Sequence, residues 1–147
     1  MDINTAKEAL RLDKQLCFPI YAASREVIKQ YHPCLTNMNL TYTQYLVMMV
    51  LWEKSPVTEK EMGRRLHLDS GTLTPVLKSL ETKGYIRRSR SKEDERVVCV
   101  FLSDDGAALE ERAVGIPGLI QEAVPLSDEE KVTLTALLNK ILSGVEE

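Results

Sequence analysis

The sequence is poor in the residues that build disulfide scaffolds and metal sites. Its 147 residues include only three cysteines, Cys17, Cys34 and Cys99, and two histidines, His32 and His67, which lie far apart. An odd cysteine count in a chain of this size argues against a disulfide framework. Because no CxxC motif and no cluster of histidine and cysteine occurs, we expect no structural metal site. We also expect no cofactor.

Long apolar runs are also absent. No run approaches the roughly 18–20 residues of a membrane span, and none resembles a signal peptide. We therefore expect a cytoplasmic protein that does not bind a membrane. Charged residues make up 28% and hydrophobic residues 44% of the chain, values close to globular averages, which excludes wholesale disorder. The length fits a single domain, 1–147, with a sizeable core.

The formal net charge of −3 hides an uneven distribution of charge. Between Lys60 and Arg96, ten Lys and Arg face six Asp and Glu, a net charge of +4, whereas the rest of the chain carries −7. A basic segment in an acidic protein indicates a local anion-binding surface, with nucleic acid as the obvious ligand. A solvated surface without a ligand would show the same excess of positive charge. The predicted arrangement of helices and strands therefore has to distinguish the two interpretations.

Helical patterns dominate the chain. The spacing of apolar residues predicts helices over 6–31, 42–54, 59–66, 70–83, 104–121 and 128–143. Capping boxes, in which a Ser or Thr is followed three residues later by Glu, are expected at Thr5, Thr58 and Ser127. Pro19 either kinks the first helix or restarts it. The stretch from Gly115 to Pro125 is expected to bend or interrupt the fifth.

One region favours strands instead. Residues 85–89 and 96–102 are rich in β-branched and aromatic side chains, and a charged stretch, 90–95, separates them. This pattern predicts a β-hairpin with a charged tip. The order of short helix, tight turn near His67, second helix and basic hairpin is typical of a winged helix-turn-helix. The predicted fold class is therefore mainly α with a small β-wing.

In a winged helix-turn-helix the second helix presents its first residues to base edges in the major groove. Asp69 is a suitable N-cap, although Pro75 leaves open a helix that begins at Pro75 with Thr74 as its cap. Short hydroxyls and basic side chains suit base edges and phosphates, and an arginine of the wing tip suits a minor groove. The candidate DNA-binding residues are Arg64, Arg65, Asp69, Ser70, Thr72, Thr74, Lys78, Arg87, Arg88, Arg90, Lys92, Asp94 and Arg96.

Asp94-Glu95-Arg96, followed by Leu102-Ser103, resembles the wing signature of the MarR family of bacterial transcription regulators. The resemblance covers nearly the whole chain. It implies a winged-helix part at about 42–102 and a homodimer formed through the helices of 1–41 and 103–147. It also implies that Asp94 stabilises the wing and that Arg96 sets wing geometry or contacts DNA. The apolar stripe on the last helix agrees with dimerisation, although an intramolecular core would give the same stripe.

The segments 15–26 and 68–75 are most similar to the OhrR-type organic hydroperoxide sensors of this family. The resemblance implies that Cys17 is the redox sensor and that two tyrosines of the partner subunit, Tyr31 and Tyr42, hydrogen-bond to it. Since no cysteine follows Cys99, a low-molecular-weight thiol is the expected resolving partner. Cys34 stays open as a resolver; we expect it in a helix-end loop, and Cys99 buried in the second wing strand.

Physical chemistry independently supports Cys17 as the redox sensor. If Pro19 opens a helix, Cys17 lies where free N–H groups and the helix dipole stabilise a thiolate. Leu16, Phe18 and Ile20 would then line a pocket for apolar peroxides. A buried inert cysteine is the plainer interpretation of the same residue.

These observations predict a homodimeric repressor that binds a pseudo-palindromic double-stranded DNA operator and releases it when an organic hydroperoxide oxidises Cys17. Three alternatives stay open. The first is a regulator of the same fold that responds to a small phenolic or carboxylic ligand, with Cys17 structural. The second is a thiol peroxidase, for which Arg25 is the only modest candidate catalytic partner. The third is an adaptor whose basic segment binds an acidic protein.

Overall fold

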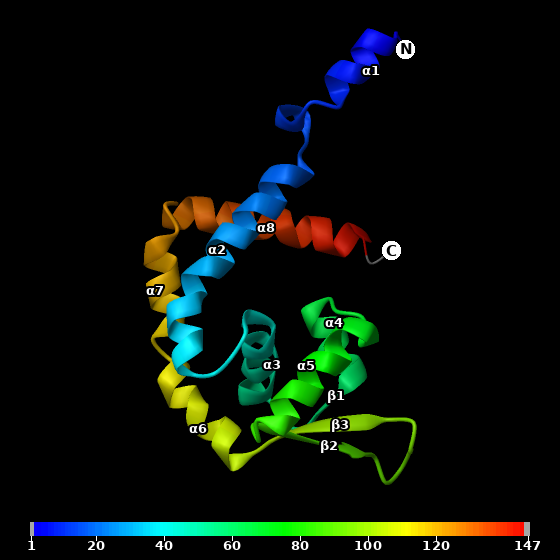
Figure 1. Cartoon of the computed structure of the whole chain (residues 1–147), viewed down its shortest axis with the longest axis vertical. Helices are drawn as coiled ribbons and strands as arrows, with labels where there is room; N and C mark the ends of the chain where they lie inside the picture. Colours follow the sequence, from blue (N-terminus) through cyan, green and yellow to red (C-terminus); the bar gives the residue numbers. More distant parts are fainter. Residues whose placement is uncertain (1, 146–147) are drawn as a thin grey trace.

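The computed structural model describes residues 2–145, which form eight α-helices, one 3-10 helix and a three-stranded antiparallel sheet (Figure 1). The elements are α1 (Ile3–Ala9), η1 (Leu12–Lys14), α2 (Cys17–Asn37), α3 (Tyr42–Glu53), β1 (Val57–Thr58), α4 (Glu59–Leu66), α5 (Ser70–Thr82), β2 (Ile86–Arg90), β3 (Val98–Leu102), α6 (Asp104–Ala113), α7 (Ile116–Ala123) and α8 (Asp128–Val145). This architecture confirms the predicted fold class. No helix in the described part of the chain is long and apolar enough to cross a membrane.

The single helix predicted over 6–31 is wrong, because α1, η1 and α2 take its place. The backbone leaves helical geometry at Arg11, with ψ 139°, and again at Gln15, with ψ 122°. The side-chain amide of Gln15 donates to the carbonyl oxygens of Ala9, at 2.7 Å, and Arg11, at 2.9 Å. The bond to Ala9 satisfies a carbonyl left open where α1 ends. Pro19 is the third residue of α2, where a backbone N–H would have no helical partner, so it marks a restart and not a kink.

A second proline lies inside α2. The loop expected around Cys34 is absent from the described chain, because α2 continues through Pro33 to Asn37. Pro33 is exposed and costs the helix one backbone donor. The hydroxyl of Thr36 donates to the carbonyl of His32 at 2.8 Å within the same turn. Cys34 is therefore a half-buried helical residue.

Two of the three predicted capping boxes have the expected first bond. The Thr58 hydroxyl accepts from the Glu61 N–H at 3.1 Å and opens α4. At α8, Ser127 accepts from the Glu130 N–H at 3.1 Å, and the Glu130 carboxylate accepts from the Ser127 N–H at 2.8 Å. The box predicted at Thr5 is wrong, since Thr5 lies inside α1, whose N-cap is Asp2.

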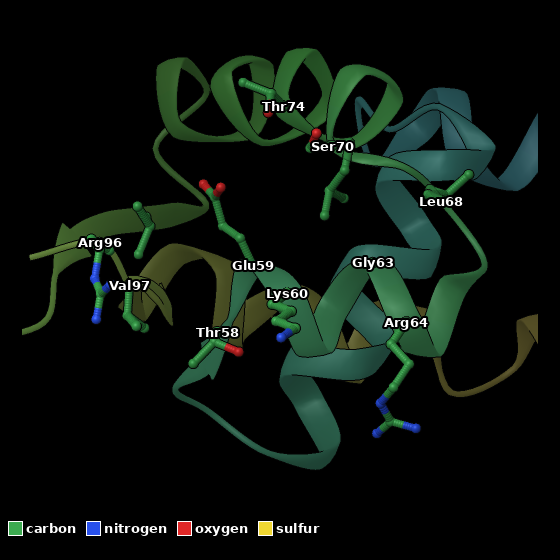
Figure 2. A pocket seen from close by; sticks show the side chains of 12 residues that line it. Thr58, Glu59, Lys60, Gly63, Arg64, Leu68, Ser70, Thr74, Arg96 and Val97 are labelled. Atoms are coloured by element: carbon green, nitrogen blue, oxygen red, sulfur yellow. The ribbon is translucent and has the colours of Figure 1, made fainter. Parts of the chain in front are cut away.

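Helices α4 and α5 form the helix-turn-helix (Figure 2). The turn needs two special positions. His67 takes the left-handed conformation, with φ 53°, and a Cβ on Gly63 would lie 2.8 Å from the carbonyl oxygen of Leu68. Asp69 then caps α5, accepting from the Thr72 N–H at 2.7 Å. The alternative start at Pro75 is wrong, because Pro75 lies within α5.

The predicted hairpin is confirmed as β2 and β3, with Ile86 opposite Leu102 and Arg90 opposite Val98. The strand order is β1-β3-β2. The short strand β1, which the sequence pattern did not indicate, pairs Val57 with Val100. It ties the segment before α4 to the centre of the wing sheet.

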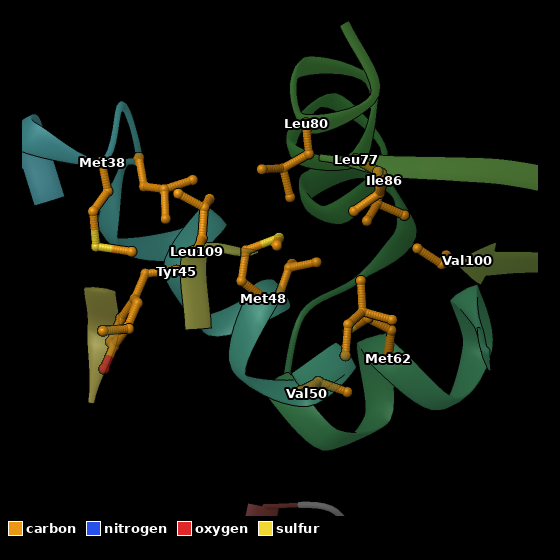
Figure 3. Packing of buried hydrophobic residues seen from close by; sticks show 14 of the residues in the cluster. Met38, Tyr45, Met48, Val50, Met62, Leu77, Leu80, Ile86, Val100 and Leu109 are labelled. Carbon is orange, nitrogen blue, oxygen red and sulfur yellow. The ribbon is translucent and has the colours of Figure 1, made fainter. Parts of the chain in front are cut away.

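One core holds the helix-turn-helix, the sheet and α3 together (Figure 3). Leu73, Leu77 and Leu80 of α5 are buried, as their i, i+4, i+7 spacing predicts. They meet Met48 of α3 and Met62 of α4 among the fully buried side chains. Helix α5, which we call the recognition helix, is thus fixed along one face, and its opposite face is exposed to solvent.

The C-terminal helices complete the fold. The helix predicted over 104–121 is interrupted at Val114 and Gly115, as expected from the glycine there, and forms α6 and α7. The apolar stripe of α8 is not an internal core, because Leu134, Leu137 and Ile141 are exposed in the protomer. Helix α7 packs against α2, and in Figure 1 α1 extends away from the body.

Candidate DNA-binding surface and redox site

The exposed face of α5 carries the short polar side chains predicted to contact DNA. Ser70, Thr72 and Lys78 are exposed, whereas Thr74 is half-buried beside α4. The bond from the Thr72 N–H holds the pKa of Asp69 below its usual range. Asp69 is thereby an ionised cap at physiological pH, which aligns the first turn of the helix.

Helix α4 contributes two arginines that differ in their surroundings. Arg64 is exposed and lines the groove between α4 and α5, and in Figure 2 its guanidinium points away from α5. Arg65 pairs with Glu53 of α3 at 2.6 Å. Arg65 therefore has to share or leave this partner to contact a phosphate.

The wing tip is ordered by one acidic residue. Asp94 accepts from the Arg96 backbone N–H at 3.0 Å and from the Arg96 guanidinium at 3.1 Å through both carboxylate oxygens. The guanidinium of Arg96 holds the pKa of Asp94 below its usual range. The side chain of Arg96 stays 90% exposed. This geometry fits a wing-stabilising Asp94 and leaves Arg96 open to solvent.

Three further basic residues lie along the wing. Arg90 donates to the carbonyl of Glu95 at 2.8 Å, and Lys92 is exposed at the tip. The guanidinium of Arg87 lies 4.5 Å from the centre of the Phe101 ring, a cation–π contact on the outer face of the hairpin. All three remain on the surface.

Arg88 differs from its expected position. Its guanidinium pairs with Glu59 of α4 at 3.4 Å and with Glu81 of α5 at 3.2 Å, and its side chain is 20% exposed. In this conformation Arg88 braces the wing against both helices and does not reach outward. No sequence pattern indicates this pairing, because both carboxylates lie on other elements, Glu59 on α4 and Glu81 on α5.

A groove of about 510 Å³ separates α4, α5 and the wing (Figure 2). Ser70 and Thr74 of α5 face Glu59 and Lys60 of α4 across it, and Arg96 lies at its wing side. Four of the predicted DNA-binding residues line this groove: Arg64, Ser70, Thr74 and Arg96.

Cys17 is the first residue of α2, and its side chain is exposed. Apolar side chains surround it in sequence and are exposed as well: Leu16 is 72%, Phe18 43% and Tyr21 58% accessible. Exposed apolar side chains gathered in this way indicate an interaction surface.

Tyr31 and Tyr42 are in contact, with ring centres 4.9 Å apart. Tyr45 and Trp52 extend the cluster, and the indole N–H of Trp52 donates to the Gly106 carbonyl at 3.0 Å. Burial, followed by the neighbouring Tyr42 and Tyr45, raises the pKa of Tyr31 to about 12. Burial likewise raises the pKa of Tyr42. Both phenols are therefore neutral hydrogen-bond donors at physiological pH.

Cys17 and the tyrosine pair are separated within one protomer. Cys17 and Tyr31 are fourteen residues apart in the same helix, about 21 Å at 1.5 Å per residue. Cys99, expected to be buried, is half-buried in β3, and all three cysteines are free. Among residues 2–145, no three His, Cys, Asp or Glu side chains are grouped as a metal site requires.

Comparison with known proteins matches residues 29–112, more than half of the chain, to the family described as transcriptional regulator SarA/Rot. The organic hydroperoxide resistance transcriptional regulator of Bacillus subtilis (strain 168) is 49% identical over 138 residues, 94% of each chain. The regulator SarZ of Staphylococcus haemolyticus is 42% identical over 133 residues, 90% of each chain.

Solved structures agree with this match. AbfR of Staphylococcus epidermidis has a TM-score of 0.75 at 36% identity, over 97% of this chain and 99% of that one. Reduced AbfR bound to DNA has a TM-score of 0.78 at the same identity and coverage. The chain belongs to the SarA/Rot family of MarR-type winged-helix regulators, and it is a DNA-binding transcriptional regulator and not an enzyme.

Proposed function

We propose that this regulator is a homodimeric repressor that releases its operator when an organic hydroperoxide oxidises Cys17. The observation that carries the proposal is the position of Cys17: an exposed thiol at the first turn of α2, set among the exposed apolar side chains Leu16, Phe18 and Tyr21. Water-exposed apolar groups around a thiol favour an alkyl peroxide over hydrogen peroxide. The relative from Bacillus subtilis, named for organic hydroperoxide resistance, supports this choice of oxidant.

The apolar surface that the protomer leaves uncovered supports the proposed dimer. Exposed apolar residues concentrate in the N-terminal arm and in α8, including Leu10, Leu12, Leu134, Leu137 and Ile141. A two-fold dimer formed through these elements would bury the apolar surface around Cys17. It would also let the Tyr31 and Tyr42 phenols of one subunit donate to the Cys17 thiolate of its partner, since within one protomer Tyr31 lies about 21 Å from Cys17 along α2.

The chemistry requires one oxidant and one thiol. The Cys17 thiolate attacks the terminal peroxide oxygen, an S–O bond forms as the O–O bond breaks, and the sulfur is oxidised to sulfenic acid. The leaving alkoxide takes up one proton and becomes an alcohol. A low-molecular-weight thiol then displaces water from the sulfenic acid and forms a mixed disulfide. Either product replaces a thiolate with a larger group beside the dimer interface, which changes the spacing of the two recognition helices.

The DNA contacts we propose combine α5, α4 and the wing. Ser70, Thr72 and Thr74 would read base edges and phosphates from α5, with Asp69 as the cap that aligns them. Phosphate contacts are assigned to Arg64, Arg65, Lys78, Arg87, Arg90, Lys92 and Arg96. Asp94 acts by holding Arg96, and Arg88 acts by bracing the wing.

The experiment is fluorescence anisotropy of the reduced protein on double-stranded DNA from upstream of its own gene. One equivalent of cumene hydroperoxide is then added in the presence of a small thiol. We expect release that dithiothreitol reverses and that the Cys17→Ser variant lacks. Peroxide-driven release of Cys17→Ser would refute the assignment of the sensor.

A second candidate is the ligand-responsive regulator. It is favoured by a groove of about 340 Å³ between α2 and the start of α3, lined by apolar residues such as Ile28 and Leu40, where the His32 ring could bind a carboxylate. Operator binding that ignores peroxide but is weakened by a small phenolic or carboxylic acid would support this alternative.

A further inference from the structure

The carboxyl end of α2 has three consecutive backbone carbonyls that are all held by side chains from distant parts of the chain. The carbonyls of residues 37, 38 and 39 accept from Arg112 at 2.5 Å, Tyr85 at 3.3 Å and Lys83 at 2.7 Å. The donors lie 75, 47 and 44 residues away in sequence. The last carbonyls of a helix have no partner within it, and its negative end favours cations. We call this arrangement the carbonyl clamp.

Two of the three donors belong to the end of the recognition helix. Both α2 and α5 end in a Schellman motif, with left-handed residues Asn39 (φ 55°) and Gly84 (φ 82°). In α5 the Tyr85 N–H returns to the Leu80 carbonyl at 3.1 Å, which fixes the direction of the chain after the helix. Lys83 and Tyr85 flank Gly84, so the same turn that ends α5 aims both side chains at the end of α2.

Lys83 is also tied to a buried amide. Its ammonium donates to the Gln44 side-chain oxygen at 2.8 Å, and the Gln44 amide donates to Ser79 of α5 at 2.9 Å. Gln44 is 5% exposed, and desolvation lowers the pKa of Lys83. An ammonium that is partly desolvated and bonded to oxygens of the α2–α3 turn and of α3 is held in one position, unlike a lysine side chain that moves freely in water.

We propose that the carbonyl clamp couples the position of α2 to the recognition helix, with Lys83 as the main positioning residue. This inference rests on the proposed redox function. Helix α2 is about 30 Å long, with Cys17 at its first residue and the clamp at its last turn. A tilt of α2 produced by oxidation at one end therefore moves the carbonyls at the other end, and Lys83 transfers that movement to α5.

The test compares operator affinity before and after peroxide treatment in Lys83→Met, which keeps the apolar stem and removes the donor. Allosteric coupling of this kind changes affinity by about 5–150-fold, and we expect the ratio of oxidised to reduced Kd to fall about tenfold in the variant. Oxidation of Cys17, followed by intact mass, should proceed at the wild-type rate. A merely structural role would weaken both states equally and leave the ratio unchanged, which would overturn the proposal.

The matched control is Lys29→Met, which removes a lysine paired with Glu26 on the surface of α2. Its ratio should equal that of the wild type. If Lys83→Met does not fold, Tyr85→Phe and Arg112→Gln each remove one bond of the clamp. Wild-type ratios in both of those variants would overturn the proposal.

A second measurement needs no peroxide. Because coupling is reciprocal, operator binding at α5 should slow amide hydrogen exchange at residues 35–40 in the wild type, and less so in Lys83→Met. If the wild type ignores peroxide, the proposed redox function is wrong, and this exchange experiment alone decides the clamp. If operator binding left the hydrogen exchange of residues 35–40 unchanged in the wild type, the proposed coupling through the carbonyl clamp would be refuted.

Discussion

Glu81 on the recognition helix accepts two hydrogen bonds from Arg88 on the first wing strand, one from its backbone N–H at 2.9 Å and one from its guanidinium at 3.2 Å. The same guanidinium reaches Glu59 of α4 at 3.4 Å. One arginine thus joins the wing to both helices of the helix-turn-helix. The relative position of wing and recognition helix, which sets how both fit DNA, depends on this group.

Replacing Arg88 with Met should destabilise the protein, because both carboxylates lose their cation. Glu81 is 38% and Glu59 25% exposed, so water screens the pair, and the buried Nε of Arg88 has no hydrogen-bond partner among the described residues. We therefore expect a loss of about 1–2 kcal/mol in the free energy of unfolding, between the values for surface and buried pairs. Urea denaturation measures it.

The control is Arg90→Met, which removes an exposed arginine from the same strand. Its effect on the free energy of unfolding should stay below about 0.5 kcal/mol. Equal losses for the two variants would show that Arg88 has no special bracing role.

The pH dependence of stability should carry the signature of Glu81. The Arg88 N–H, and then its guanidinium, hold the pKa of Glu81 below the usual 4.5 in the folded state. The unfolded chain therefore binds the proton more readily, so this contribution is complete above about pH 4.5 and is lost as the pH falls through the folded pKa. Glu81→Gln should flatten the fall of stability between pH 5 and the acid limit, measured by urea denaturation at each pH. An identical acid profile in the variant would contradict this origin.

Tyr31 should resist ionisation at alkaline pH. In the folded protein its pKa is about 12, whereas in the unfolded chain it is near 10. Between these two pH values the phenol stays protonated in the folded protein and loses its proton in the unfolded chain. Its contribution to stability is therefore complete below pH 10 and is lost as the pH rises to about 12. Absorbance at 295 nm should show a late-titrating tyrosine that Tyr31→Phe removes. A tyrosine titration finished by pH 11 in folded protein would contradict the burial of this phenol.

Features made within a few residues could be predicted from the sequence. The cap of α5 at Asp69 and the capping box at Ser127 each need a partner three residues away, so residue type and spacing are sufficient. The buried leucines of α5 follow from helical periodicity in the same way. The hairpin was predictable because its two strands are adjacent in the chain.

Features that depend on partners distant in the sequence could not be predicted in this way. The residue type and position of Arg88 are those of a DNA-contacting wing residue. Only the packing of β2 against α4 and α5 directs its side chain toward the protein interior. Lys83 likewise has the sequence context of a phosphate contact, yet it donates to Asn39 and Gln44 about forty residues away. At the N-terminus, a side-chain bond from Gln15 ends a helical pattern that apolar spacing alone would continue.

Lys92 at the wing tip allows the DNA-binding surface to be tested by salt dependence. Each phosphate contact releases counterions and contributes about 0.9 to the slope of log K against log salt concentration. Because Lys92 is exposed and carries one charge, Lys92→Ala should weaken operator binding and reduce this slope by about 0.9 per protomer, without changing sequence preference. Lys29→Ala removes the same charge from the surface of α2 and should leave the slope unchanged. Equal slopes for Lys92→Ala and the wild type would remove Lys92 from the DNA interface.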